Sequence, residues 1–273
     1  MSRKISPTCL VLIFCLLFLY SSNNAQAGLN SWTPIGPAFV GEGGSHRYTC
    51  SIAFSANFAE NGKIFMGDEL GYVYIYNKDN NTWSNIYLKE ISLEGSAEAA
   101  WWLEAMAVAP DDTVFVGSSN GYRVYRSPDS GNTWEDISRF REPGGVPISA
   151  HLQFGISPNF VQDGTVFMVG SHGVACSTDR GDNWENKSTG LPSGYILYCI
   201  ALSPDYSNNS DKPIFVGGYG LYRSTNNGDD WDELGDLPAS PNSNKPIVYS
   251  LAISPNFPQD QTLFAAVELD TDS

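Results

Sequence analysis

The sequence is poor in basic residues. It has 15 lysines and arginines against 30 aspartates and glutamates, a formal net charge of −15 at pH 7. A protein that binds a phosphate backbone neutralises it with clusters of lysine and arginine, so this balance argues against a nucleic-acid partner. The acidic surplus suits a solvated surface outside the cell.

Cysteine is also scarce. The chain has 5 cysteines, and Cys9 and Cys15 lie in the N-terminal leader described below. Cys50, Cys176 and Cys199 remain, an odd number spread along the chain, which excludes a disulfide framework. One bridge among them and three buried thiols are both compatible with the sequence.

Only one long apolar run is present. It extends from Cys9 to Tyr20, after the basic Arg3 and Lys4 and before the small-x-small segment 25–27. This order is typical of a secretory signal peptide, and the run is shorter than the roughly 20 residues that cross a bilayer. We expect residues 1–27 to be removed and the mature chain to be exported, either secreted or periplasmic. An uncleaved signal-anchor helix is the alternative.

No segment has the period of a helix, and a strand pattern recurs instead about every 50 residues. Each repeat opens with an alternating strand, called a, whose central residue is small: Ala53, Ala107, Gly155, Ala201 and Ala252. A polar turn leads to a second strand, b, such as KIFMG, TVFVG or PIFVGG. A glycine turn leads to a third strand, c, such as GYRVYRS or GLYRS.

Strand c runs into a recurring turn: SPDSGNTW (127–134), STDRGDNW (177–184) and STNNGDDW (224–231). We expect its tryptophan to start the fourth strand, d. Four short strands in each unit of this length predict an all-β fold, a β-propeller whose blades are four-stranded antiparallel sheets.

The recurring turn has a physical logic. Its serine and aspartate side chains can bond backbone amides, and its glycine supplies a backbone conformation that other residues resist. Its tryptophan is expected to fill an apolar gap between neighbouring turns or blades, so that Trp184→Ala would lower the stability. The structural residues are Ser127, Asp129, Gly131, Trp134, Ser177, Asp179, Gly181, Trp184, Ser224, Asn226, Gly228 and Trp231.

These turns resemble Asp-box (BNR) repeats. The resemblance covers residues 32–273 and points to the sortilin-, sialidase- and xyloglucanase-like propellers, and to Asp-box propellers that assist photosystem II assembly. Asn226 replaces the aspartate in the third copy, and YNKDNNTW (76–83) keeps only the tryptophan.

The blades are expected near residues 48–93, 101–141, 149–190, 196–240 and 247–273, the last of them incomplete. Residues 32–36 look like a lone strand d of the kind that closes a propeller. About four and a half blades in residues 28–273 predict that the chain is part of a six- to eight-bladed propeller.

Propeller ligands usually bind around the axis, on the face opposite the Asp-box turns. There Trp101 and Trp102 stand beside Glu98 and Glu104. This resembles a sugar-binding arrangement, because aromatic faces stack on pyranose rings and carboxylates accept hydroxyl protons. Packing between blades is the alternative role for the two tryptophans. The candidate ligand-binding residues are Trp101, Trp102, His46, Arg47, Glu104, His151 and His172.

The three histidines map to this same face but come from different loops. We therefore expect surface histidines rather than a metal site, and no cofactor.

Two hydrolase families were weighed. Sialidases with Asp boxes begin their arginine triad in an Arg-Ile-Pro motif, which this sequence lacks. GDELGY (67–72) resembles the first catalytic segment of the xyloglucanases, which implies Asp68 as a catalytic carboxylate and Glu98 as a candidate second one. In that family the second aspartate comes from a second propeller, absent here. A hydrolase needs two carboxylates about 5–10 Å apart.

The sequence thus favours an exported, non-catalytic propeller that recognises a protein or a glycan through these loops, with no nucleic acid, no membrane span and an open oligomeric state. The alternative is a glycoside hydrolase of the xyloglucanase-like type.

Overall fold

The computed structural model describes residues 49–91, 102–119, 123–138, 149–171, 173–194, 196–207, 211–235, 237 and 245–268. All of them lie in one compact unit, Arg47–Ser273. The expected signal peptide (1–27), the expected closing strand (32–36) and the candidates His46, Arg47, Glu98, Trp101 and His172 lie outside the described residues. No helix of the described part is long and apolar enough to span a membrane.

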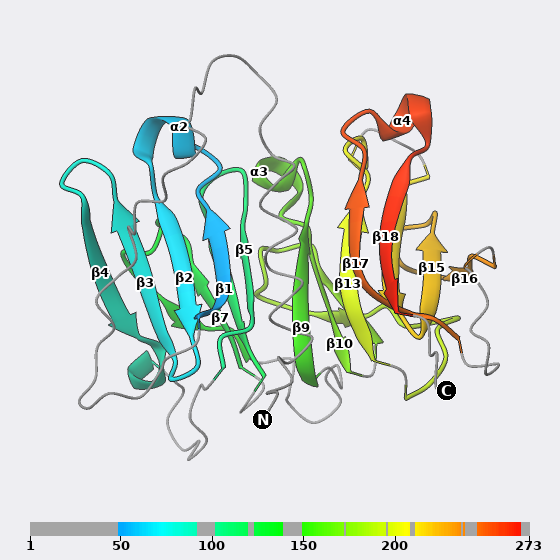
Figure 1. Cartoon of the computed structure of the whole chain (residues 1–273), viewed down its shortest axis with the longest axis horizontal. Helices are drawn as coiled ribbons and strands as arrows, with labels where there is room; N and C mark the ends of the chain where they lie inside the picture. Colours follow the sequence, from blue (N-terminus) through cyan, green and yellow to red (C-terminus); the bar gives the residue numbers. More distant parts are fainter. Residues whose placement is uncertain are drawn as a thin grey trace, which may run out of the picture. The chain divides into compact units, whose positions relative to one another are not determined.

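The described residues form five antiparallel sheets in chain order (Figure 1). Sheet 1 contains β1 (Thr49–Phe54), β2 (Ile64–Asp68), β3 (Tyr72–Asn77) and β4 (Thr82–Tyr87). Sheet 2 contains β5 (Ala105–Val108), β6 (Val114–Ser118), β7 (Arg123–Ser127) and β8 (Glu135–Asp136). Sheet 3 contains β9 (Ser149–Ile156), β10 (Val166–Ser171), β11 (Gly173–Ser177) and β12 (Glu185–Asn186). Sheet 4 contains β13 (Leu197–Leu202), β14 (Ile214–Gly218), β15 (Gly220–Ser224) and β16 (Asp232–Glu233). Sheet 5 contains β17 (Ile247–Ile253) and β18 (Leu263–Glu268). Four sheets of four strands and one of two confirm the predicted four and a half units.

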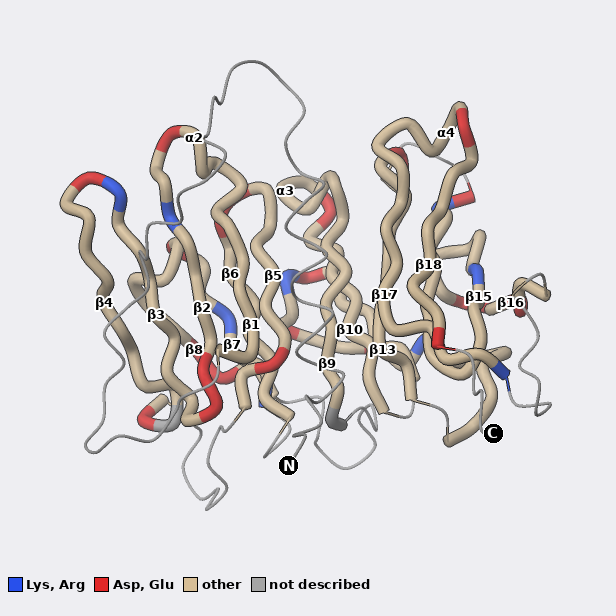
Figure 2. Tube along the Cα trace, in the orientation of Figure 1, with Lys and Arg blue, Asp and Glu red and all other residues tan. Residues whose placement is uncertain are grey.

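The first strand of each sheet lies against the first strand of the next. β1 contacts β5, β5 contacts β9, β9 contacts β13, and β13 contacts β17. The strands β9, β13 and β17 carry no charged residue and are tan along their described length in Figure 2. At Gly155 this approach is close, because a Cβ added there would lie 2.5 Å from Leu202 Cδ1 of the next sheet and the leucine side chain would have to shift.

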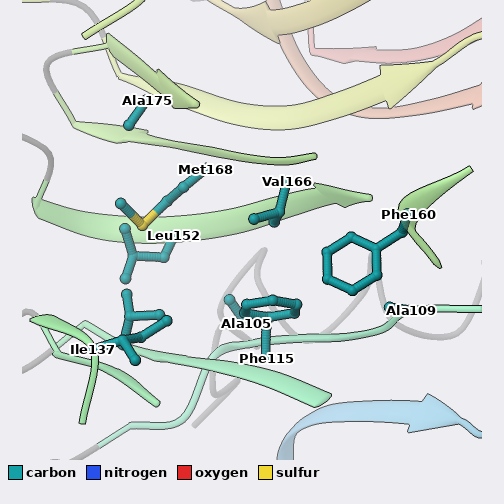
Figure 3. Packing of buried hydrophobic residues seen from close by; sticks show 10 residues of the cluster. Ala105, Ala109, Phe115, Ile137, Leu152, Phe160, Val166, Met168 and Ala175 are labelled. Carbon is teal, nitrogen blue, oxygen red and sulfur yellow. The ribbon is translucent and has the colours of Figure 1, made fainter. Parts of the chain in front are cut away.

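The core lies between successive sheets. Figure 3 shows Phe115 and Ile137 of sheet 2 facing Leu152, Val166 and Met168 of sheet 3. Phe160 closes one end of this layer, with its ring edge-on to Phe115 at 5.8 Å between centroids. Burying one such side chain contributes about 1.5–3 kcal/mol, so these inter-sheet layers hold neighbouring sheets together.

Two local features differ from the sequence-based prediction. Three of the turns between the first and second strands contain a single helical turn: α2 (Phe58–Asn61), α3 (Phe160–Asp163) and α4 (Phe257–Asp260). Four residues are too few to display a helical period, which is why the pattern missed them.

The prediction that tryptophan starts strand d was wrong in sheets 2–4, where that strand begins one residue later and has only two residues. A 3₁₀ helix, η2 (Leu88–Ile91), follows β4.

Cys50, Cys176 and Cys199 form no disulfide bond, which decides between the two alternatives left open by the sequence. Cys176 and Cys199 are buried and Cys50 is half-buried. Burial raises the pKa of the Cys176 thiol to about 12. This thiol therefore stays protonated and unreactive at neutral pH.

Candidate functional site

The recurring turns hold themselves together with their own polar side chains. Ser177 Oγ accepts a bond from Gly181 N (2.8 Å) and donates to Asp179 Oδ1 (2.7 Å), which also accepts from Asn183 N (2.8 Å). Burial raises the pKa of Asp179, but the donors from Asn183 and Ser177 outweigh it and hold the pKa below its usual range. The carboxylate is occupied by the turn and is not a candidate for ligand chemistry.

The other two copies repeat this pattern. Ser127 Oγ accepts from Gly131 N (2.8 Å), and Asp129 Oδ1 accepts from Thr133 N (2.7 Å). In the third copy the Asn226 side-chain oxygen takes the place of the carboxylate and accepts from Asp230 N (3.0 Å). Asparagine can therefore replace aspartate because only its acceptor oxygen is needed.

Each turn is also seated on the preceding sheet. Gly181 has φ +96°, and a Cβ added to it would lie 2.8 Å from Ile137 Cδ1 of sheet 2. The indole of Trp231 donates from Nε1 to Lys187 O of sheet 3 (2.7 Å). Trp134 and Trp231 are buried and Trp184 is half-buried, each against an inter-sheet apolar cluster. These residues position the sheets rather than a ligand.

At the opposite end of the first strands, away from the recurring turns, the pairing with the second strands is irregular. The pairing with the second strand slips by one residue between Thr49 and Ser51, between Leu197 and Cys199, and between Val248 and Ser250. In sheet 3 the slip lies opposite Val169–Ser171, where His151 has φ +54°. A β-bulge re-aims the side chain of its extra residue and is frequent beside binding sites.

The bulges bring one side chain from each of sheets 3, 4 and 5 into a continuous series. The His151 ring meets the Tyr198 ring edge-on at 5.6 Å between centroids. The Tyr198 ring meets the Tyr249 ring at 5.0 Å, and Tyr249 donates its hydroxyl to Glu268 Oε2 (2.8 Å). At the other end Glu104 of the segment before β5 accepts from Leu152 N (3.2 Å). We call Glu104, His151, Tyr198, Tyr249 and Glu268 the aromatic row.

The aromatic row presents three aromatic rings between two acidic side chains. Burial is the main cause of a raised pKa at Tyr198, with a contribution from the nearby Tyr219 and Glu268. Burial and the bond to Glu268 raise the pKa of Tyr249 further. Both phenols are therefore neutral at physiological pH. His151 is exposed and the two tyrosines are half-buried, so their faces and hydroxyls can contact a ligand.

The raised pKa of the Glu104 carboxyl leads to a pH dependence of stability that can be measured. Burial raises its pKa above the usual value, against the opposing effects of His151 and of the backbone amides of Leu152 and His151. A carboxyl with a raised pKa in the folded state stabilises the fold below its unfolded pKa, and this stabilisation is lost as the pH rises through the folded value.

We therefore expect Glu104→Gln to raise the melting temperature relative to the parent at pH 7, with the difference disappearing near pH 4. Thermal melts of both proteins from pH 4 to pH 8 measure this. A difference independent of pH would contradict the assigned titration.

The structure brings three of the predicted ligand residues together. Trp102, 47 % exposed, has φ +60° and accepts the bond from Glu104 N through its carbonyl (2.8 Å). Glu104 in turn adjoins His151. Tyr198, Tyr249 and Glu268 were not predicted. Alignment of the repeats contains the missing signal, because Glu104, Tyr198 and Tyr249 occupy the same place in strand a of their units.

Asp68, the candidate catalytic carboxylate, has a different environment. It is 1 % exposed, and its Oδ1 accepts from Leu70 N and Tyr72 N, both at 2.9 Å. Its Oδ2 accepts from the hydroxyl of Tyr74 (3.2 Å). The carboxylate caps the turn between β2 and β3 and is closed to solvent. Among the described residues no group of three histidine, cysteine or acidic side chains is arranged to hold a metal ion.

Comparison with known proteins gives similarity at the level of the fold. No family model matches the sequence, and no curated protein matches it. Solved structures do match. A chain of the mitotic checkpoint complex superposes with a TM-score of 0.61 at 12 % identity, over 89 % of this chain and 65 % of that one. An ancestral GH74 enzyme gives 0.59 at 19 % identity, over 89 % of this chain and 30 % of the enzyme. The chain has the β-propeller fold.

A third match is YCF48 bound to D1 peptide, with a TM-score of 0.50, 17 % identity, and coverage of 77 % of this chain and 59 % of that one. The propeller described here spans less than two thirds of the length of each of these chains. Propellers are used both by enzymes and by proteins that hold partners. The choice between them depends on the site.

Proposed function

We propose that the protein is an exported, non-catalytic β-propeller that binds a protein or glycan segment along the aromatic row. The observation that carries this proposal is the continuous contact from Glu104 through His151, Tyr198 and Tyr249 to Glu268 across four sheets. Tyrosine and histidine offer rigid apolar faces and polar tips, which suits neutral ligands with hydroxyl or amide groups. Carboxylates at both ends accept hydrogen bonds from such groups.

Several further features fit this role. The propeller match bound to D1 peptide is an example of this fold binding a peptide. The acidic balance disfavours a nucleic-acid ligand. We also propose that the Ser-x-Asp/Asn-x-Gly turns are Asp-box repeats, whose polar groups are occupied in holding the sheets. We also propose Trp101 and His172, candidates from the sequence alone, as ligand-binding residues.

Replacing single tyrosines of the aromatic row tests the proposed binding site. Tyr198→Ala and Tyr249→Ala are each expected to weaken binding by about fivefold or more, because truncating a central aromatic contact typically costs over 1 kcal/mol. Ligands are found on a glycan array and a peptide array, and affinities are then measured by calorimetry. Tyr76→Ala is the matched control, since Tyr76 lies in sheet 1 and bonds Asn81. Unchanged affinity in both row variants would refute the proposed site.

A glycoside hydrolase is the second candidate. It is favoured by the GH74 match and by the raised pKa of Glu104, which suits a general acid. The buried and fully bonded Asp68 counts against it. Release of reducing sugar from xyloglucan, lost in Glu104→Gln, would establish the hydrolase in place of the binding protein.

A further inference from the structure

The outer edge of sheet 1 differs from the outer edges of sheets 2–4. Each of these four sheets has all four of its strands, with the fourth strand at the border. β8, β12 and β16 have two residues each, whereas β4 has six and pairs with β3 along its whole length. Figure 1 shows β4 as the long border strand of sheet 1. In the described part of the chain β4 pairs with no strand other than β3.

The composition of β4 also sets it apart. The short border strands carry acidic side chains: Glu135 and Asp136 in β8, Glu185 in β12, and Asp232 and Glu233 in β16. β4 has the sequence TWSNIY, without charge or proline, and is tan along its length in Figure 2. Short strands, charged side chains and proline are the usual protection of a sheet edge against pairing with a further strand. β4 has none of them.

The backbone groups of β4 alternate between two directions. Leu88 N donates to Gly71 O (3.0 Å), which makes these two residues a hydrogen-bonded pair at the end of the β3–β4 ladder. Bonded and non-bonded pairs alternate along antiparallel strands. Ile86 therefore directs its backbone groups toward β3, whereas Asn85 and Tyr87 direct theirs outward. The Asn85 side chain is exposed and that of Tyr87 is half-buried, so another strand can reach this edge.

Two aromatic pairs lie on the same face of the β3–β4 ribbon as Asn85. The Tyr87 ring stacks on the Tyr72 ring at 4.6 Å between centroids, and the Trp83 ring lies 5.2 Å from the Tyr76 ring. Residues two apart in a strand share a face, so the two pairs stand on either side of Asn85. A strand added at this edge would therefore meet aromatic surface at both of its ends.

We propose that β4 pairs in antiparallel fashion with β4 of a second copy of the chain, about a two-fold axis at Asn85. Asn85 then exchanges two backbone hydrogen bonds with Asn85 of the other copy. Tyr87 of each copy comes to lie opposite Trp83 of the other, and cross-strand aromatic pairs of this kind stabilise a sheet. The two copies of sheet 1 become one continuous sheet.

The distribution of charge favours a second copy at this edge over the other edges. The chain has a formal net charge of −15, so two copies repel each other over most of their surface. β4 brings no charge to the contact, and each of its flanks has one lysine and one acidic residue: Lys78 and Asp79 before it, Lys89 and Glu90 after it. Antiparallel pairing sets the first flank of one copy beside the second flank of the other. The contact region therefore has no net charge and offers opposite charges across the axis.

Sedimentation velocity over about a hundredfold range of protein concentration tests the proposal. The parent protein is expected to shift from monomer to dimer as its concentration rises. Asn85→Lys places two like charges opposite each other at the axis and is expected to weaken the dimer about fivefold or more. Ala59→Lys is the matched control, because it adds the same charge at an exposed residue of α2, in the same sheet but outside β4. The control should dimerise like the parent.

Asn85→Cys tests the register and keeps the test decisive if Asn85→Lys does not fold. Opposite residues of a hydrogen-bonded pair have Cα atoms about 5.5 Å apart, which a disulfide can bridge. Air oxidation is therefore expected to link two copies through residue 85, whereas Ala59→Cys and the parent should stay unlinked.

Two results overturn the proposal directly: a parent that is monomeric at every concentration, or a dimer that Asn85→Lys weakens no more than Ala59→Lys does. A linked dimer that forms as readily through residue 59 as through residue 85 would contradict the register and the proposal with it. A monomeric parent that binds a synthetic peptide of residues 81–88 would identify β4 as an edge for a strand of another protein, and this outcome also overturns the second copy as occupant.

Discussion

Replacing Trp231 by alanine is expected to lower the free energy of unfolding by about 3–5 kcal/mol, the usual range for truncating a buried tryptophan. Trp231 is 4 % exposed and packs in the apolar cluster between sheets 3 and 4. Its indole also donates to Lys187 O of sheet 3. The substitution therefore opens a cavity and leaves a carbonyl of the preceding sheet without this donor. Calorimetric unfolding measures the loss.

Trp83→Ala is the matched control for Trp231→Ala. Trp83 belongs to the repeat whose turn lacks the serine, aspartate and glycine, and its ring lies tilted by 48° to the Tyr76 ring at 5.2 Å between centroids. Its removal is expected to cost about 1 kcal/mol. Equal losses in the two variants would show that Trp231 does not fasten sheet 4 to sheet 3.

Gly67→Val is expected to destabilise the protein by about 3 kcal/mol, at the upper end of the cost of overpacking. A Cβ at Gly67 would lie 2.6 Å from Ser51 Oγ, 2.7 Å from Leu103 Cβ and 2.9 Å from Leu103 O. Ser51 Oγ donates to that same carbonyl, which joins sheet 1 to the start of sheet 2. The larger side chain would separate these groups, because the obstacle is partly backbone and cannot rotate away.

The control for Gly67→Val is Gly235→Val. No atom of the described residues lies within 4 Å of a Cβ placed at Gly235, and its backbone is not in the left-handed region. We expect this variant to melt like the parent, within about 0.5 kcal/mol. A comparable loss at both positions would mean that the effect of valine at Gly67 does not come from the approach of sheets 1 and 2.

The sequence predicts the sheets better than the site because the two depend on different kinds of information. The alternation of the strands and the Ser-x-Asp-x-Gly turns are local, and they recur, so each copy supports the others. The hydrogen bonds of Ser177 and Asp179 follow from that local chemistry. The two-residue length of β8, β12 and β16 does not follow from local chemistry, because the contact of each turn with the preceding sheet also affects where the fourth strand can pair.

The aromatic row depends on contacts between units. His151, Tyr198 and Tyr249 come from three different sheets, and their proximity requires the bulges that turn them toward one another. A bulge is a slip of one residue in pairing, which leaves no distinct sign in a single strand. The burial of Asp68 was missed for a different reason: its partners are local, but GDELGY alone does not show that the Tyr74 hydroxyl and two backbone amides enclose the carboxylate.

Each recurring turn packs on the sheet that precedes it in the chain, so the series of sheets has a direction. Among the described residues, sheets 2 and 3 each receive a turn from the next sheet and supply one to the sheet before, so the unfolding of either costs two such contacts, while sheet 1 only receives a turn. The cooperativity of unfolding in such a chain comes from the contacts between neighbouring sheets. Strain introduced at one junction would therefore be felt mainly by the two sheets that meet there, and the aromatic row would be sensitive to strain at each of the junctions that it crosses between sheets 2 and 5.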